Sequence, residues 1–169
     1  MKIAIIGYAG SGKSTLAENL SKKFNLPILH IDKISFNPNW VEKNNEERKD
    51  LMKDFLDSNE TNWVIDGTYS KVYFEERMQQ ADKIIFLNFN RFTCYFQALK
   101  RAFKYKNKHR DSAPKGCNEK FSLSFQWWIL YTGRTKKRKQ LFIDTVNNYS
   151  SKVVILKKRR EVQKYLNSK

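Results

Sequence analysis

The stretch Gly7-Tyr8-Ala9-Gly10-Ser11-Gly12-Lys13-Ser14, which Thr15 follows, matches the pattern G-x-x-x-x-G-K-[ST] at every fixed position. The apolar run from Lys2 to Ile6 in front of it is typical of a buried strand, and residues 15–24 behind it have the pattern of a helix. Between a strand and a helix, such glycines let the backbone close around a phosphate while the helix N-terminus directs its N–H groups at the anion. The alternative interpretation, a Gly/Ser turn that binds nothing, would make the full match a coincidence. The sequence therefore predicts a nucleotide-binding loop.

This pattern predicts specific contacts with a nucleotide. We expect the Lys13 ammonium to reach the β- and γ-phosphates and the Ser14 hydroxyl to bind Mg²⁺. ATP and Mg²⁺ are the expected ligand and cofactor. The residues expected to hold the nucleotide are Gly7, Gly10, Ser11, Gly12, Lys13, Ser14 and Thr15.

Length and composition indicate one domain that spans residues 1–169. The chain is 40% hydrophobic, which is enough for a core, and it is short for two domains. It has no run near the ~20 apolar residues of a membrane span. Its apolar N-terminus leads into the phosphate loop instead of a signal-peptide cleavage site, so we expect a cytoplasmic protein with no membrane partner. The two cysteines, Cys94 and Cys117, are too few for a disulfide framework and lack the spacing of a zinc site.

Charge is divided unevenly between the two halves of the chain. Residues 1–85 contain 12 basic residues (Lys and Arg) and 13 acidic ones (Asp and Glu). Residues 86–169 contain 21 basic residues and 4 acidic ones. The second half therefore carries the whole net charge of +16. Such an asymmetry favours a polyanionic partner. A nucleotide is itself a polyanion, however, and a solvated basic face is a further interpretation.

Two acidic side chains follow predicted strands. Asp32 ends the run 27–32, and Asp66 stands near the end of the run 61–67. Because ligands bind at the carboxyl ends of strands in open α/β sheets, we expect both residues in the site. A carboxylate in this position typically holds a Mg²⁺-bound water, so Ser14 and Asp66 are the predicted metal residues. The alternatives are a turn-capping Asp32 and a turn-forming Asp66, and His30 is interpreted as a core residue.

The remaining elements are predicted from periodicity and turn signals. We expect helices at 44–58 and about 69–80, strands at 83–87 and 153–156, and a short final helix. Residues 105–120 are poor in apolar side chains and are expected to form a mobile loop in the position of a lid. A long helical segment from near residue 121 is expected to include the basic run 134–139. After residue 91, a stripe with helical spacing is expected to face the core: Phe92, Tyr95, Phe96, Leu99, Ala102 and Phe103.

The alternation of strands and helices predicts a mostly parallel sheet that is covered on both faces. Together with a phosphate loop after the first strand, it predicts the three-layer α/β/α fold of P-loop proteins.

Several segments beyond the phosphate loop resemble a known family. They are 30–34 (His-Ile-Asp-Lys-Ile), 63–67 (Trp-Val-Ile-Asp-Gly), Arg110…Cys117…Glu119-Lys120 and Trp127-Trp128-Ile129. Over nearly its whole length the chain resembles the bacterial family labelled DNA topology modulation protein, which is in turn similar to adenylate kinase and related small-molecule kinases. The resemblance implies a five-stranded parallel sheet in the order 2-3-1-4-5 and an arginine-bearing lid at about 101–120. Adenylate kinases usually continue Asp-Gly with Phe-Pro-Arg, and this chain departs from that pattern at residues 68–70 (Thr-Tyr-Ser).

The first functional hypothesis is an ATP-dependent phosphotransferase that acts on an unidentified small-molecule acceptor. Phosphoryl transfer depends on positioning and charge neutralisation. The predicted catalytic residues are Lys13, Asp32, Asp66, Arg101, Arg110 and Arg134. The similarity to adenylate kinases implies that the loop with Lys157 and Arg159 flanks the adenine.

The second hypothesis is a nucleotide-regulated protein that binds nucleic acid through its basic second half. Basic runs with nearby aromatic residues support it, but no helix-turn-helix or other reader motif accompanies them. Under the first hypothesis, we expect any DNA binding to be weak and sensitive to salt. ATP hydrolysis coupled to a protein partner is a further alternative.

Overall fold

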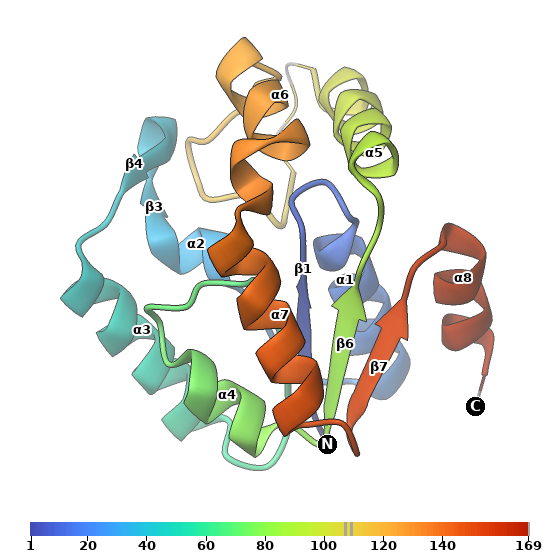
Figure 1. Cartoon of the computed structure of the whole chain (residues 1–169). Coiled ribbons are helices and arrows are strands. Elements are labelled where there is room, and N and C mark those ends of the chain that lie inside the picture. Colours follow the sequence, from blue (N-terminus) through green and yellow to red (C-terminus); the bar gives the residue numbers. More distant parts are fainter. Residues whose placement is uncertain (107, 109, 169) are drawn as a thin grey trace.

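Five short apolar runs pair in one parallel sheet. A computed structural model describes residues 1–106, 108 and 110–168 (Figure 1). The strands are β1 (Lys2–Gly7), β2 (Ile28–His30), β5 (Trp63–Asp66), β6 (Lys83–Leu87) and β7 (Val153–Leu156). Their order is β2-β5-β1-β6-β7, and every pairing in this sheet is parallel. Counted along the chain within this sheet, the order is 2-3-1-4-5, as the resemblance implied.

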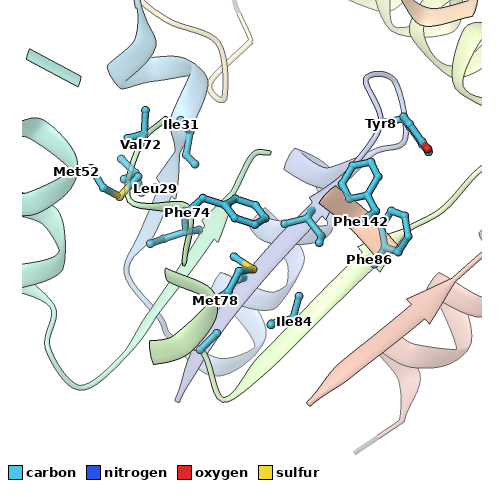
Figure 2. Close-up of a cluster of buried hydrophobic side chains, with 14 of the residues drawn as sticks. Tyr8, Leu29, Ile31, Met52, Val72, Phe74, Met78, Ile84, Phe86 and Phe142 are labelled. Carbon is cyan, nitrogen blue, oxygen red and sulfur yellow. The ribbon is translucent and has the colours of Figure 1, made fainter. Parts of the chain in front are cut away.

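Side chains that alternate along the strands bury two separate hydrophobic clusters. Ile3 and Ile5 of β1 pack against α1 (Lys13–Phe24) and α8 (Arg159–Asn167) on one face of the sheet. Ala4 and Ile6 face the other side, which α3 (Asn45–Ser58), α4 (Phe74–Gln80) and α7 (Lys136–Asn148) cover. Figure 2 shows this second cluster, with Phe86 of β6 stacked on Phe142 of α7 at a centroid distance of 4.5 Å. The sheet is therefore the middle layer of three, which confirms the predicted fold class.

A small two-stranded unit between β2 and α3 was not predicted beyond a turn at residues 37–40. The chain leaves β2 through the short helix α2 (Ile31–Ser35) and then forms β3 (Phe36–Asn37), the 3-10 turn η1 (Pro38–Trp40) and β4 (Val41–Glu42). β3 and β4 pair antiparallel as a separate sheet. Asn39 and Trp40 adopt positive φ angles of 63° and 64°. This tight reversal brings the chain back to the end of α2, where the Lys43 N–H donates to the Ser35 carbonyl oxygen at 2.9 Å.

The prediction that a stripe within residues 92–103 faces the core is wrong for all three of its phenylalanines. These residues lie on α5 (Arg91–Lys104), where Phe92, Phe96 and Phe103 are 64%, 63% and 71% exposed. The buried residues of α5 are small, Cys94 and Ala98. They lie against the phosphate loop, where a Cβ atom on Gly10 would come within 2.4 Å of the Cys94 carbonyl oxygen. Because only small side chains fit that close approach, the large aromatic side chains occupy the opposite side of the helix.

Two expected helices are shorter than periodicity predicted. The helix expected at 69–80 begins at Phe74, because residues 67–73 form a loop that is tied to the Arg77 side chain. The long helical segment expected after residue 121 is interrupted, giving α6 (Leu123–Leu130), the 3-10 turn η2 (Thr132–Arg134) and then α7. The interruption occurs at Gly133, where a Cβ atom would lie 2.6 Å from the Trp128 carbonyl oxygen.

Candidate functional site

The phosphate loop joins β1 to α1 at the carboxyl edge of the sheet. Gly10 and Gly12 have φ angles of 74° and 87°, in the left-handed region that side chains rarely adopt. Gly12 is also the residue at which α1 begins, and no side chain caps the first turn of that helix. The amide groups at the start of α1 are therefore available to an anion, which is the arrangement that phosphate binding requires.

Lys13 and Ser11 supply polar groups whose bonding in the protein is incomplete. The Lys13 ammonium donates a hydrogen bond to the Tyr8 carbonyl oxygen at 2.9 Å. Desolvation lowers the pKa of Lys13 from its ordinary 10.5, while Asp66 and Asp32 oppose this shift. The buried Ser11 Oγ has no hydrogen-bond partner among the described residues. A desolvated cation beside the uncapped N-terminus of a helix fits a polyphosphate ligand.

Ser14, Asp66 and His30 form a chain of hydrogen bonds below the loop. The Ser14 hydroxyl donates to Asp66 Oδ2 at 2.8 Å, and His30 Nδ1 lies 2.5 Å from Asp66 Oδ1. Because Ser14 uses its proton in this bond, its lone pairs remain available to a cation. The pair of oxygen-bearing residues predicted for Mg²⁺ therefore fits a hard divalent ion. Among the described residues, no cluster of three or more His, Cys, Asp or Glu side chains offers another metal site.

His30 is buried, as the sequence interpretation held, but it also contacts the candidate metal residue, which that interpretation missed. The signal was available in the strand pattern, because β2 and β5 pair in parallel with His30 directly opposite Asp66. Both residues are the last of their strands. The second ring nitrogen of His30 lies 4.0 Å from a Glu18 carboxylate oxygen.

The loop after β5 connects the phosphate loop to Asp32. Thr68 Oγ1 accepts a hydrogen bond from the Gly7 N–H at 3.0 Å and lies 3.2 Å from the Gly7 carbonyl oxygen. Tyr69 donates its hydroxyl proton to Asp32 Oδ1 at 2.7 Å. Burial, followed by the charge of Asp32, raises the pKa of Tyr69, so the phenol remains a donor. Thr68 is thus bonded to the phosphate loop, and its neighbour Tyr69 is bonded to Asp32.

Arg77 fixes the conformation of that loop and was also missed by the sequence analysis. Its side chain is fully buried, and its guanidinium donates to the carbonyl oxygens of Gly67 (3.2 Å), Tyr69 (3.0 Å), Val72 (3.1 Å) and Tyr73 (3.3 Å). Burial lowers the pKa of Arg77 to about 9. A side chain with five donors suits a position where several carbonyl groups converge.

Two of the predicted lid arginines share one carboxylate. Arg101 Nε and Arg110 Nε lie 3.0 Å and 2.8 Å from the two oxygens of Glu119, whose side chain is 3% exposed. Arg110 also donates to Ser112 Oγ at 2.5 Å. Glu119 therefore holds the two guanidinium groups next to each other.

The segment between α5 and α6 is bonded to the small β3–β4 unit. Asn39 N–H donates to the Gly116 carbonyl oxygen at 3.1 Å, and Trp40 Nε1 donates to that of Asn118 at 2.9 Å. The Trp40 N–H lies 3.3 Å from Cys117 Sγ. The segment expected to form a lid thus contacts the unit on the other side of the site; positions 107 and 109 of it lie outside the described residues.

These elements surround one cavity of about 1070 Å³. Residues of the phosphate loop line it, and so do Asp32, Trp40, Tyr69, Arg101 and Arg110. A further lining residue, Arg48 of α3, was not predicted. It is 9% exposed, and its Nη2 atom donates to Asn45 Oδ1 at 2.5 Å. Its Nε atom has no partner among the described residues, and its Nη1 atom lies 3.8 Å from the exposed Glu42 carboxylate.

Three predicted site residues do not line this cavity, and one of them is the buried Ser11 of the phosphate loop. Arg134 lies over the Tyr8 ring at 3.8 Å and donates to the Phe89 carbonyl oxygen at 3.0 Å, so the break before α7 directs it behind the phosphate loop. Lys157 is exposed beyond β7, where its N–H donates to Glu161 Oε2 at 2.6 Å. Arg159, the other residue expected near the adenine, does line the cavity.

Lys13→Ala is expected to weaken ATP binding by about 10–150-fold, because it removes a charge-assisted contact with the phosphates. Folding should change little, since Lys13 faces the cavity. Calorimetric titration with Mg²⁺-ATP measures the effect, and Lys22→Ala, on the exposed side of the same helix, is the matched control.

A pH series provides a second check on Lys13. A bound polyphosphate would raise the lowered Lys13 pKa, so binding should take up protons in the alkaline range, and ATP affinity should fall as the pH rises. The Lys13→Ala protein should lose this dependence. Unchanged ATP affinity in a folded Lys13→Ala protein would contradict the assignment.

The sheet order and the loop between β1 and α1 define a P-loop protein with a kinase-like α/β fold. A family model described as an AAA domain matches residues 3–113, and the chain belongs to this family. No curated protein matches the chain significantly.

Solved structures with a similar fold include three kinases. Deoxyadenosine kinase from M. mycoides with bound dATP is 18% identical at a TM-score of 0.58, covering 98% of this chain and 95% of that chain. A sugar kinase from Janibacter sp. is 12% identical at a TM-score of 0.52, covering 98% and 89%. Shikimate kinase from Aquifex aeolicus is 18% identical at a TM-score of 0.48, covering 98% and 94%. At these identities the likeness to the deoxyadenosine kinase and the sugar kinase shows the fold alone.

Proposed function

We propose that the protein is an ATP-dependent phosphotransferase that acts on a small-molecule hydroxyl compound. The observation that carries this proposal is the shared cavity, which brings Lys13 of the phosphate loop, Asp32 and two arginines around one space. Its volume of about 1070 Å³ is at the upper end of common ligand pockets, which suits a nucleotide and a second small molecule together.

The phosphate loop is proposed to hold the donor. Lys13 and the amide groups at the start of α1 would bind the phosphates of ATP. Ser14 and Asp66 would hold Mg²⁺, which supplies charge neutralisation when bound, and His30 would keep the Asp66 carboxylate oriented. Arg159 is the residue proposed to flank the adenine.

Asp32 is proposed to act on the acceptor. The acceptor oxygen would attack the γ-phosphorus, the bond from that phosphorus to the β,γ-bridging oxygen would break, and ADP would leave. Asp32 would take the hydroxyl proton of the acceptor. The bond from Tyr69 orients the Asp32 carboxylate for this role. Arg101 and Arg110 would neutralise the transferring phosphoryl group, because the guanidinium fork suits phosphate oxygens.

Arg48 suggests that the acceptor carries an anionic group. A buried guanidinium with an unpaired Nε and one distant carboxylate partner is incompletely compensated. A carboxylate or phosphate on the acceptor would satisfy it while the acceptor hydroxyl faces Asp32. The aromatic pair Phe36 and Trp40, with ring centroids 5.4 Å apart, also lines the cavity.

The experiment that tests this function is a screen for ADP formation from Mg²⁺-ATP with hydroxyl compounds that carry, or lack, a carboxylate or phosphate. We expect turnover with an anionic acceptor. Arg48→Met should raise its KM by about 10–150-fold, and Lys49→Met, the partly exposed neighbour on α3, is the matched control. Absence of ADP formation in a protein that binds ATP would reject the phosphotransferase. Turnover of neutral acceptors that Arg48→Met leaves unchanged would reject the acceptor class alone.

The competing proposal is a nucleotide-regulated protein that binds nucleic acid. The basic second half favours it. Part of that basic charge already has a role in the proposed site, because Arg101 and Arg110 are engaged by Glu119 at the cavity. We therefore rank it second.

A further inference from the structure

Helices α5 and α6, together with Tyr131 directly after α6, expose six large apolar side chains, which we call the aromatic face. Their exposed fractions range from 50% to 83%, with Leu123 the most exposed. Its members are Phe92, Phe96, Phe103, Leu123, Trp127 and Tyr131. Contiguous exposed apolar side chains of this size on a folded domain mark an interaction surface.

The amphipathic pattern of α5 is directed outward. Phe92 and Phe96 lie one turn apart, and Phe103 follows two turns later on the same stripe. Cys94 and Ala98 lie on the opposite stripe, against the phosphate loop. The phenylalanines of α5 therefore face away from the core, although their helical spacing predicted that they would be buried in it.

The members on α6 adjoin those on α5. The two helices lie side by side in the upper part of Figure 1, and Tyr95 of α5 donates to Gln126 Oε1 of α6 at 2.9 Å. Arg91, at the start of α5, lies over the Tyr131 ring at 5.6 Å. Tyr131 in turn lies 4.3 Å from the Trp127 ring. Residues at the end of α6 thus meet the beginning of the α5 stripe.

The part of the chain that carries the aromatic face is rich in positive charge. Residues 91–139 contain 14 Lys and Arg and two acidic residues, Asp111 and Glu119. Glu119 is buried against Arg101 and Arg110, so it is not available to a partner. A second copy of this chain would bring the same positive charges to the interface. The complementary occupant is negatively charged and offers an apolar interior.

We propose that the aromatic face docks onto an anionic lipid surface. Phe and Leu side chains would enter the boundary of the acyl chains, and Trp127 and Tyr131 would lie at the headgroups, where amphipathic rings are favoured. Exposed lysines that do not line the cavity, such as Lys136, Lys137 and Lys139, would contact anionic headgroups.

This contact is peripheral. No helix in the described part of the chain has the length and apolarity to cross a bilayer. The proposal reverses the expectation of no membrane partner, which the absence of a long apolar run suggested. Nucleic acid is the less favoured occupant, because a duplex presents phosphates and not base faces to the phenylalanines, and Leu123 has no ring on which a base could stack. The inference does not rest on the phosphotransferase proposal.

Flotation of the full chain with vesicles tests the proposal, using neutral phosphatidylcholine with and without phosphatidylglycerol. We expect binding to the anionic vesicles, with a shift of tryptophan emission to shorter wavelength as Trp127 leaves water. Leu123→Ser and the triple change Phe92→Ser, Phe96→Ser, Phe103→Ser should each weaken binding, the triple by about tenfold or more. Ile143→Ser, an exposed aliphatic residue on α7, is the matched control and should have no effect.

Several results would overturn the proposal. They are absence of vesicle binding, equal binding to neutral vesicles, or binding that neither the triple variant nor Leu123→Ser weakens. Light scattering that shows a dimer lost in these variants would assign the face to a second copy. Fluorescence anisotropy that shows duplex DNA binding without vesicle binding would assign it to nucleic acid. If the triple variant does not fold, Leu123→Ser and Trp127→Ser decide the question individually.

Discussion

Asp32→Asn is expected to lower turnover on an identified acceptor by about 10²–10⁴-fold, the range typical of a lost general base. Asparagine has nearly the same shape and keeps an oxygen that accepts the 2.7 Å bond from Tyr69, but it does not take up the acceptor proton. ATP binding should be almost unchanged, because the contacts proposed for the nucleotide come from the phosphate loop. Steady-state kinetics and calorimetry on the same protein separate these two effects.

The control for this prediction is Asp54→Asn, which changes an exposed carboxylate on α3 and should leave turnover unaltered. Tyr69→Phe offers a graded comparison, because it removes the orienting bond and keeps the Asp32 carboxylate. Full turnover in Asp32→Asn would show that the residue has a purely structural role, and the acceptor side of the proposed mechanism would be abandoned.

Arg77→Ala is expected to lower the free energy of unfolding by about 3–5 kcal/mol. The change would leave four backbone carbonyl oxygens without their donor and would open a cavity under the loop after β5. Arg77→Lys should also destabilise the protein, because one ammonium cannot reproduce the planar arrangement of donors. Urea unfolding at neutral pH measures the change.

Arg160→Ala removes an exposed arginine and should leave stability within the error of the measurement. Loss of the Arg77 contacts should reach the site as well, since the same loop carries Thr68 and Tyr69. We therefore expect Arg77→Lys to weaken ATP binding at temperatures where it is still folded. A loss of less than about 1 kcal/mol in Arg77→Ala would show that water replaces the guanidinium.

Local signals were sufficient for the phosphate loop and the five strands. The pattern of Gly7 to Ser14 needs no distant partner, because the strand, turn and helix that form it are consecutive in the chain. Strand order followed from the resemblance to kinases, and periodicity located each strand to within a few residues. The functional roles of the site residues stay predictions.

Those local signals could not predict contacts between segments that are distant in the sequence. Arg48 is one of several charged residues on α3, and its burial depends on how that helix packs over α2. Arg134 was expected at the cavity together with Arg101 and Arg110, but the break at Gly133 turns it toward Tyr8. The direction of a side chain on a helix depends on where that helix begins, which periodicity does not define.

The sequence by itself determined that a nucleotide loop opens the chain, that five strands alternate with helices, and that α5 has one apolar stripe. These properties depend on spacing within a few turns or strands. Only the tertiary structure decided that the small side of α5 meets the phosphate loop while its phenylalanines face solvent. It also decided that His30 meets Asp66 and that Arg77 holds the loop of Tyr69. The physical reason is that the side chains which pack together depend on their shapes and on the whole fold. Periodicity shows only that a helix has an apolar face, not which residues that face contacts.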